Sequence, residues 1–103
     1  MSEYKTPNFS IDLSGQIALV TGASSGLGYR FSKVLASCGA KVAISARRKE
    51  KLESLAEEIK ANGDECMVVP IDMTDRKSIR SAVDAVSKEM GTIDTLVNNA
   101  GIP

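Results

Sequence analysis

Short apolar runs alternate with longer amphipathic segments along this chain, and no other feature of the sequence constrains the fold as strongly. The runs predict strands over residues 17–20, 41–46, 66–71 and 93–97. Between them, apolar residues recur at spacings of three and four, which predicts helices. Strands that alternate with helices are joined by right-handed crossovers, which make the strands parallel and place helices on both faces. The sequence therefore predicts an α/β fold with a doubly wound parallel sheet.

The order of the strands is indicated by a proline. The Rossmann-like form of this fold has the strand order 3-2-1-4, with the third strand at an edge. Pro70 lies in the predicted third strand, and proline, which has no N–H to donate, is expected at sheet edges. The same order brings together the carboxyl ends of the first and fourth strands. We therefore predict that Thr21-Gly22 and Asn98-Asn99 line one crevice.

The predicted helices differ in how clearly their limits are marked. The second is expected over residues 49–62, and Thr74-Asp75 offers an N-cap for the third. The first follows a glycine-rich turn. Its buried face is predicted from apolar residues at helical spacing, namely Leu27, Phe31, Val34, Leu35 and Cys38.

Length and composition indicate an ordinary globular domain. The 103 residues suit one domain, with residues 1–14 as a loose arm. Thirteen basic and thirteen acidic side chains cancel, which argues against nucleic-acid partners. No apolar run approaches the roughly 20 residues that span a bilayer, so no membrane association is expected. The polar start of the chain, with its early Glu3, does not resemble a secretory signal, and we expect a cytoplasmic protein.

Metal binding and histidine chemistry are disfavoured by the residue types present. The chain has no histidine, which removes the commonest general base and the nitrogen ligands of zinc. Cys38 and Cys66 lie far apart in apolar stretches without a CxxC partner. Buried thiols are therefore expected rather than a disulfide or a metal site.

The sequence TGASSGLG at residues 21–28 joins the first predicted strand to the first helix. A strand-to-helix turn exposes the first N–H groups of the helix at the positive end of its dipole, which suits a phosphate. Alternatively, Gly22, Gly26 and Gly28 serve only a tight turn and close packing. A P-loop is disfavoured because no lysine accompanies the glycines. The spacing T-G-x-x-x-G-x-G also differs from the GxGxxG of other dinucleotide folds.

Three motifs together make the chain resemble a known family. TGASSGLG, IDMTD after the third predicted strand and LVNNAG on the fourth are similar to the N-terminal half of a short-chain dehydrogenase/reductase. The resemblance covers residues 12–103. It implies a half that binds a nicotinamide cofactor, whose hydride is exchanged with an alcohol or carbonyl substrate in the other half. Members of the family are mostly dimers or tetramers, so the full-length form is expected to be a homo-oligomer.

The resemblance also implies roles for individual residues. Gly22, Ser24, Ser25 and Leu27 would contact the pyrophosphate and adenosine ribose, with Gly26 and Gly28 permitting approach and packing. Asp72 would accept from the adenine amino group beside the Met73 backbone, although Asp72 as a simple turn former stays open. In the last motif, Asn99 would contact the cofactor's ribose, and Ala100 would also belong to the cofactor-binding residues. Gly101 would let the chain pass beneath the cofactor. Asn98 would be structural, tying the fourth strand to its neighbour.

The end of the second strand indicates which cofactor is preferred. A carboxylate there binds free ribose hydroxyls and repels a 2′-phosphate. This chain has Ala46 where the NAD-type pattern has aspartate, and Arg47 follows. Guanidinium suits a phosphate, so NADP(H) is predicted over NAD(H), with Arg47 as the main contact and Ser24 or Ser25 assisting. The alternative is that Arg47 belongs to a basic, solvated helix start.

The catalytic residues that the resemblance implies are not found in this sequence. The family uses a serine, a Tyr-x-x-x-Lys pair and an asparagine, all of which lie beyond the region of resemblance. Tyr29 and Lys33 have the Tyr-x-x-x-Lys spacing, but they follow the glycines directly, and we interpret the match as accidental. We expect these 103 residues to be the cofactor-binding half of an oxidoreductase, inactive alone. The alternative is a nucleotide-binding module without chemistry.

Overall fold

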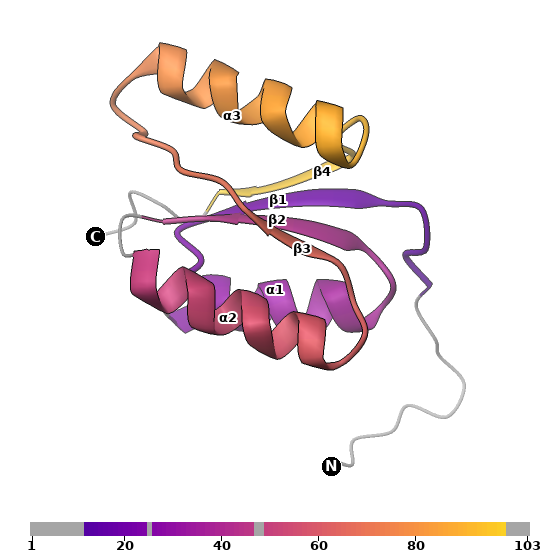
Figure 1. Cartoon of the computed structure of the whole chain (residues 1–103). Helices are drawn as coiled ribbons and strands as arrows, with labels where there is room; N and C mark the ends of the chain where they lie inside the picture. Colours follow the sequence, from indigo (N-terminus) through magenta and orange to yellow (C-terminus); the bar gives the residue numbers. More distant parts are fainter. Residues whose placement is uncertain (1–11, 25, 47–48, 99–103) are drawn as a thin grey trace.

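The structure is a computed structural model that describes residues 12–24, 26–46 and 49–98. Strands and helices alternate along this part of the chain (Figure 1). In chain order they are β1 (Ile17–Thr21), α1 (Gly26–Ser37), β2 (Lys41–Ser45), α2 (Lys49–Ala61), β3 (Cys66–Val68), α3 (Arg76–Glu89) and β4 (Thr95–Asn98). Most of the predicted N-terminal arm lies outside the described residues.

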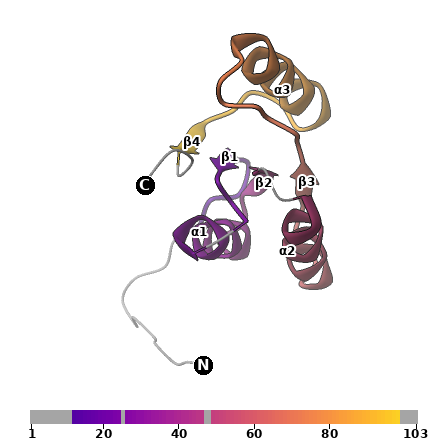
Figure 2. The same ribbon diagram turned by 90° about the vertical axis from the view of Figure 1, so that its left-hand side faces the viewer.

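The strands form one parallel sheet in the order β3-β2-β1-β4, which confirms the predicted fold. Seen along the strands, α1 and α2 cover one face and α3 lies on the other (Figure 2). All five residues of β1 are buried, as expected for an inner strand between two layers. The carboxyl ends of β1 and β4 therefore lie side by side, as the strand order predicts.

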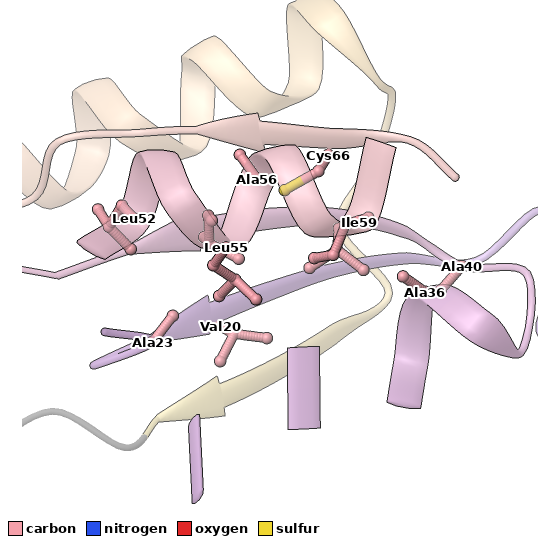
Figure 3. Packing of buried hydrophobic residues seen from close by; sticks show 11 residues of the cluster. Val20, Ala23, Ala36, Ala40, Leu52, Leu55, Ala56, Ile59 and Cys66 are labelled. Carbon is pink, nitrogen blue, oxygen red and sulfur yellow. The ribbon is translucent and has the colours of Figure 1, made fainter. Parts of the chain in front are cut away.

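The core is divided by the sheet into two clusters. The cluster under α1 and α2 contains Val20 and Ile44 from the sheet and Leu52, Leu55 and Ile59 from α2 (Figure 3). The cluster under α3 is smaller and includes Leu19, Ala43 and Val86, with other residues around them. Neighbouring residues of a strand point to opposite faces, so Leu19 and Val20 serve different clusters.

The third strand is shorter than predicted. It ends at Val68, and Pro70 lies beyond it, although Val69 still donates a backbone hydrogen bond of 2.9 Å to Ile44. The expectation that Pro70 lies within the strand is therefore wrong, because the proline ring holds the φ angle of Pro70 at about −65°, away from the extended values of a paired strand. The expected edge position of the strand is confirmed.

The predicted buried face of α1 is wrong for most of its residues. Leu27, Phe31 and Val34 are 58%, 42% and 56% exposed, while Leu35 and Cys38 are half-buried. The residues of α1 that face the core are instead Gly28, Ser32 and Ala36. Ser32 is accommodated because its hydroxyl donates to the Gly28 carbonyl oxygen at 2.8 Å. Small side chains at a four-residue spacing let the helix lie close against the sheet.

The third helix starts as its sequence predicts. Of the two candidate caps, Asp75 is the N-cap, and its carboxylate accepts from the Lys77 N–H at 2.9 Å. Such a cap satisfies one of the N–H groups that the first helical turn leaves unpaired. Thr74 has a different role, which concerns the candidate site below.

The cysteines are free thiols, as predicted. Cys66 is buried, and its burial raises the pKa of the thiol to about 11. Cys38 is only half-buried. Among the described residues, no group of three or more histidine, cysteine, aspartate or glutamate side chains is placed to hold a metal ion. The described helices include none with the length and apolar character needed to cross a membrane.

Candidate functional site

The ends of β1 and β4 form one edge of the candidate site. Thr21 and Asn98 are register partners, and the Thr21 hydroxyl donates to the Asn98 side-chain oxygen at 2.9 Å. This contact agrees with a structural role for Asn98, because it joins the two strands where they end. The predicted contacts Asn99, Ala100 and Gly101 lie outside the described residues.

The turn after β1 is held in a conformation that favours glycine. Gly22 and Gly26 have φ angles of 65° and 52°, in the left-handed region that L side chains rarely adopt. Between them, the Ala23 N–H donates to the Ser45 carbonyl oxygen at 2.9 Å, which ties the turn to β2. The turn is therefore fixed by its backbone, as a preformed ligand site requires.

The two glycines at the start of α1 have different roles. Gly28 is buried against the core. Gly26 is exposed, and a Cβ added to it would meet no heavy atom of the described residues within 4 Å. Gly28 therefore serves packing, whereas Gly26 is favoured by its left-handed backbone conformation and has open space beside it. The space in front of Gly26 lies at the N-terminus of a helix, where N–H groups and the helix dipole favour an anion.

A cavity of about 580 Å³ opens between this turn and the start of α2. Its lining consists of a glycine together with residues that carry hydroxyl or charged groups, namely Ser24, Gly26, Tyr29, Arg30, Glu50, Lys51 and Ser54. Ser24 and Gly26 were predicted from the sequence to be binding residues. Of the other residues predicted for the adenosine end, Leu27 is exposed next to Gly26, while Ser25 and Arg47 lie outside the described residues.

Sequence reasoning did not identify Arg30, Lys51 and Ser54, which line this cavity. In sequence they are ordinary polar positions on two different helices. The signal that could have found them is spacing: Arg30 follows Gly26 by four residues, and Ser54 follows Lys51 by three, so each pair shares a helix face. The packing of α1 beside α2 then brings both faces to the cavity.

Asp72 has the turn-forming role that was left open. One of its carboxylate oxygens accepts from the Thr74 N–H at 3.0 Å and from the Thr74 hydroxyl at 2.6 Å. The Asp72 N–H in turn donates to the Ser78 hydroxyl at 2.8 Å. These bonds shape the connection from β3 to α3 and leave Met73 41% exposed. The implied adenine contacts of Asp72 and Met73 stay predictions.

The Tyr29–Lys33 pair belongs to a link between α1 and α2. The Tyr29 hydroxyl donates to one Glu58 carboxylate oxygen at 2.5 Å, and the Lys33 ammonium lies 2.9 Å from the other. The hydrogen bond to the Glu58 carboxylate, more than burial, raises the pKa of Tyr29. A tyrosine that exchanges protons near neutral pH needs a lowered pKa. The structure therefore supports the interpretation that the Tyr-x-x-x-Lys spacing here is accidental.

Replacing Glu58 by glutamine is expected to lower the pKa of Tyr29. The carboxylate opposes a negative charge on the phenol, and the neutral amide removes that opposition. The pKa is read from the ultraviolet absorbance of tyrosinate during a pH titration, in a Tyr4→Phe background that leaves Tyr29 as the sole tyrosine. The matched control is Glu57→Gln on the exposed surface of α2, which should change nothing. An unchanged or higher Tyr29 pKa in Glu58→Gln would contradict the assigned contact.

Comparison with known proteins identifies the class to which this fold and turn belong. The sequence profile of the family described as short chain dehydrogenase matches residues 16–103. The chain therefore belongs to the short-chain dehydrogenase/reductase family, whose members bind nicotinamide cofactors. This confirms the resemblance drawn from the three motifs.

Individual relatives show the extent of the similarity. The glycine betaine reductase ATRR of Emericella nidulans is 47% identical over 90 residues, which are 87% of this chain and 7% of that protein. The gluconate 5-dehydrogenase of Gluconobacter oxydans is 43% identical over 87% of this chain and 35% of its own length. A solved metagenomic short-chain oxidoreductase, in complex with NADP, is 42% identical with a TM-score of 0.83, over 87% of this chain and 41% of that one. The chain thus spans less than half of each of these proteins.

Proposed function

We propose that this chain is the cofactor-binding part of an NADP(H)-dependent oxidoreductase that moves hydride between the nicotinamide and an alcohol or carbonyl substrate. The proton-transferring side chains come from a segment that corresponds to the remaining length of its relatives. In this proposal the full-length enzyme is a homo-oligomer.

The observation that carries the proposal is the preformed backbone at Gly22, Ala23 and Gly26, between β1 and the start of α1. This backbone is held in left-handed conformations at Gly22 and Gly26, and a Cβ added at Gly26 would meet no described atom within 4 Å apart from its chain neighbours and its own helix backbone. The residues fit a dinucleotide: the N-terminus of α1 suits the pyrophosphate, and the adjoining cavity offers hydroxyls and cations for the adenosine ribose. The nicotinamide supplies the hydride, while this part of the chain binds and orients the phosphate-bearing end.

The preference for NADP(H) rests on the end of β2. Ala46 follows β2 where an NAD-type pattern has aspartate, so no carboxylate at that position repels a 2′-phosphate. Arg47 is the next residue and provides a charge suited to phosphate. The solved relative in complex with NADP, at 42% identity, supports the same preference.

Arg47→Asp is expected to reverse the cofactor preference. The wild-type chain should bind NADPH at least about tenfold more tightly than NADH, since a charge-assisted contact is worth roughly 1.5–3 kcal/mol. The variant loses this contact and gains a carboxylate that repels the 2′-phosphate, so NADH should become the tighter ligand. Fluorescence titration of both reduced cofactors measures the two dissociation constants.

The matched control is Arg80→Asp, which makes the same charge change on exposed α3, across the sheet. It should leave both affinities unchanged within about twofold. Equal affinities of the wild-type chain for NADPH and NADH would overturn the cofactor preference. Turnover of a ketone or alcohol by the 103-residue chain alone would overturn the assignment of the reacting groups to another segment.

A further inference from the structure

The cavity beside the glycine turn has an excess of positive charge. Arg30 from α1 and Lys51 from α2 line it together, opposed by the single carboxylate of Glu50. Within the described part of the chain, neither Arg30 nor Lys51 has an ion-pair partner. By contrast, Lys33 on the same helix as Arg30 pairs with a carboxylate at 2.9 Å. The two cations of the cavity thus have charge available for a ligand.

The remaining lining groups also suit an oxyanion. Ser24 and Ser54 contribute hydroxyl donors to the cavity lining, one from the glycine turn and one from α2. Arginine presents a planar set of N–H donors that matches phosphate oxygens, and lysine adds a point charge. A phosphate oxyanion can therefore accept from several donors at once, and two cations against one carboxylate leave the site net positive.

The position of the cavity determines which phosphate it suits. The pyrophosphate of a dinucleotide lies at the N-terminus of α1, in front of the glycine turn. The cavity extends from that turn to the first turns of α2, and the Ala23 N–H ties the same turn to the Ser45 carbonyl oxygen at the end of β2. The adenosine ribose lies near the end of β2 in this class of fold. A phosphate bound in the cavity would consequently be the one attached to the adenosine ribose, and not one of the two phosphates of the pyrophosphate.

We infer that Arg30 and Lys51 are specificity-determining residues that bind the ribose 2′-phosphate from the two helices flanking the cavity. The inference rests on the proposed function and adds to Arg47 two residues that no motif of the sequence marks. Glu50 acts against them, because its carboxylate repels the phosphate they attract. Removing Glu50 should thus tighten, and removing either cation should weaken, the binding of a 2′-phosphorylated ligand.

The test compares two ligands that differ only in the 2′-phosphate, adenosine 2′,5′-bisphosphate and adenosine 5′-monophosphate. Binding is measured by calorimetry for the wild-type chain and for Arg30→Gln, Lys51→Gln and Glu50→Gln. Each cation variant should bind the bisphosphate about 5- to 20-fold more weakly, as expected for a lost charge-assisted contact, and Glu50→Gln should bind it more tightly. Affinity for the monophosphate should change less than about twofold.

Two controls keep the result interpretable. Lys60→Gln makes the same charge change in the last turn of α2, away from the cavity, and should not alter either affinity. Salt supplies the second measurement: raising ionic strength should weaken bisphosphate binding less in the Arg30→Gln, Lys51→Gln double variant than in the wild-type chain. Circular dichroism checks that each variant is folded, which is expected because both cations are exposed.

The outcomes separate this inference from the proposed function. Wild-type preference for the bisphosphate that survives both cation substitutions would overturn the roles of Arg30 and Lys51 while leaving the NADP(H) proposal intact. Equal binding of the two ligands by the wild-type chain would overturn both the cofactor preference and this inference. Failure to bind either nucleotide, NADPH or NADH would overturn the proposed function itself and this inference with it.

Discussion

Replacing Gly26 by alanine is expected to weaken nicotinamide-cofactor binding by at least about a hundredfold while the chain stays folded. The φ angle of Gly26 is 52°, and a left-handed conformation costs an L residue roughly 1–2 kcal/mol. A Cβ at this position meets no described atom within 4 Å, so the fold tolerates it. A phosphate that approaches the helix N-terminus would meet it, and would lose several charge-assisted hydrogen bonds worth about 1.5–3 kcal/mol each.

Gly63→Ala provides a matched control for this prediction. Gly63 follows α2, has a φ angle of 86°, and a Cβ added there also meets nothing within 4 Å. The variant therefore carries a comparable backbone strain at a position away from the candidate site. Thermal unfolding and NADPH titration of both variants should show similar losses of stability and a loss of affinity in Gly26→Ala alone. Normal NADPH binding by Gly26→Ala would show that the turn does not hold the cofactor's phosphates.

Topology was the part of this structure that the sequence predicted best. The period of the apolar residues separates strands from helices, and a parallel sheet with right-handed crossovers permits few strand orders. The edge position of the third strand was predicted correctly from Pro70, although Pro70 itself lies beyond the end of β3. Limits of elements were less accurate, since the end of β3 depends on a hydrogen-bond ladder and not on side-chain pattern.

The face of α1 that meets the sheet could not be read from apolar pattern alone. The more hydrophobic stripe of α1 consists of Leu27, Phe31 and Val34, and it is exposed. The stripe that is buried against the sheet consists of Gly28, Ser32 and Ala36. Close contact with a sheet selects for small side chains, and a hydrophobicity pattern ranks those residues low. Ser32 illustrates the point, because its burial is possible only through a hydrogen bond within its own helix.

The candidate site was predictable where a local motif forms it and not where tertiary packing does. The left-handed glycines and the meeting of β1 with β4 follow from residues adjacent in sequence and from strand order. The cavity depends on two helices lying side by side, and its cations look like solvated surface charges until the helices are placed. Asp72 is a different case, because a motif marked it as a binding residue. Its hydrogen bonds to Thr74 account for it as a turn-forming residue without any ligand.

Leu55→Ala is expected to destabilise the chain by about 2–5 kcal/mol, the range for a buried leucine that leaves a cavity. Leu55 is fully buried, at 0% exposed, and lies on the side of α2 that faces the sheet, in the same cluster as Val20 and Ile59 (Figure 3). A domain of this size has a total stability of roughly 5–15 kcal/mol, so this single change removes a large share of it. Urea unfolding followed by circular dichroism measures the loss.

Val34→Ala on α1 is the matched comparison, because it also shortens an aliphatic side chain on a helix. Val34 is 56% exposed, and alanine has the higher helix propensity, so the free energy of unfolding should change by no more than about 0.5 kcal/mol. The difference in unfolding free energy between the two variants tests whether the core is formed by the sheet-facing side of α2 and not by the apolar stripe of α1. A loss from Val34→Ala as large as that from Leu55→Ala would mean that the apolar stripe of α1 is buried in solution, against the structure described above.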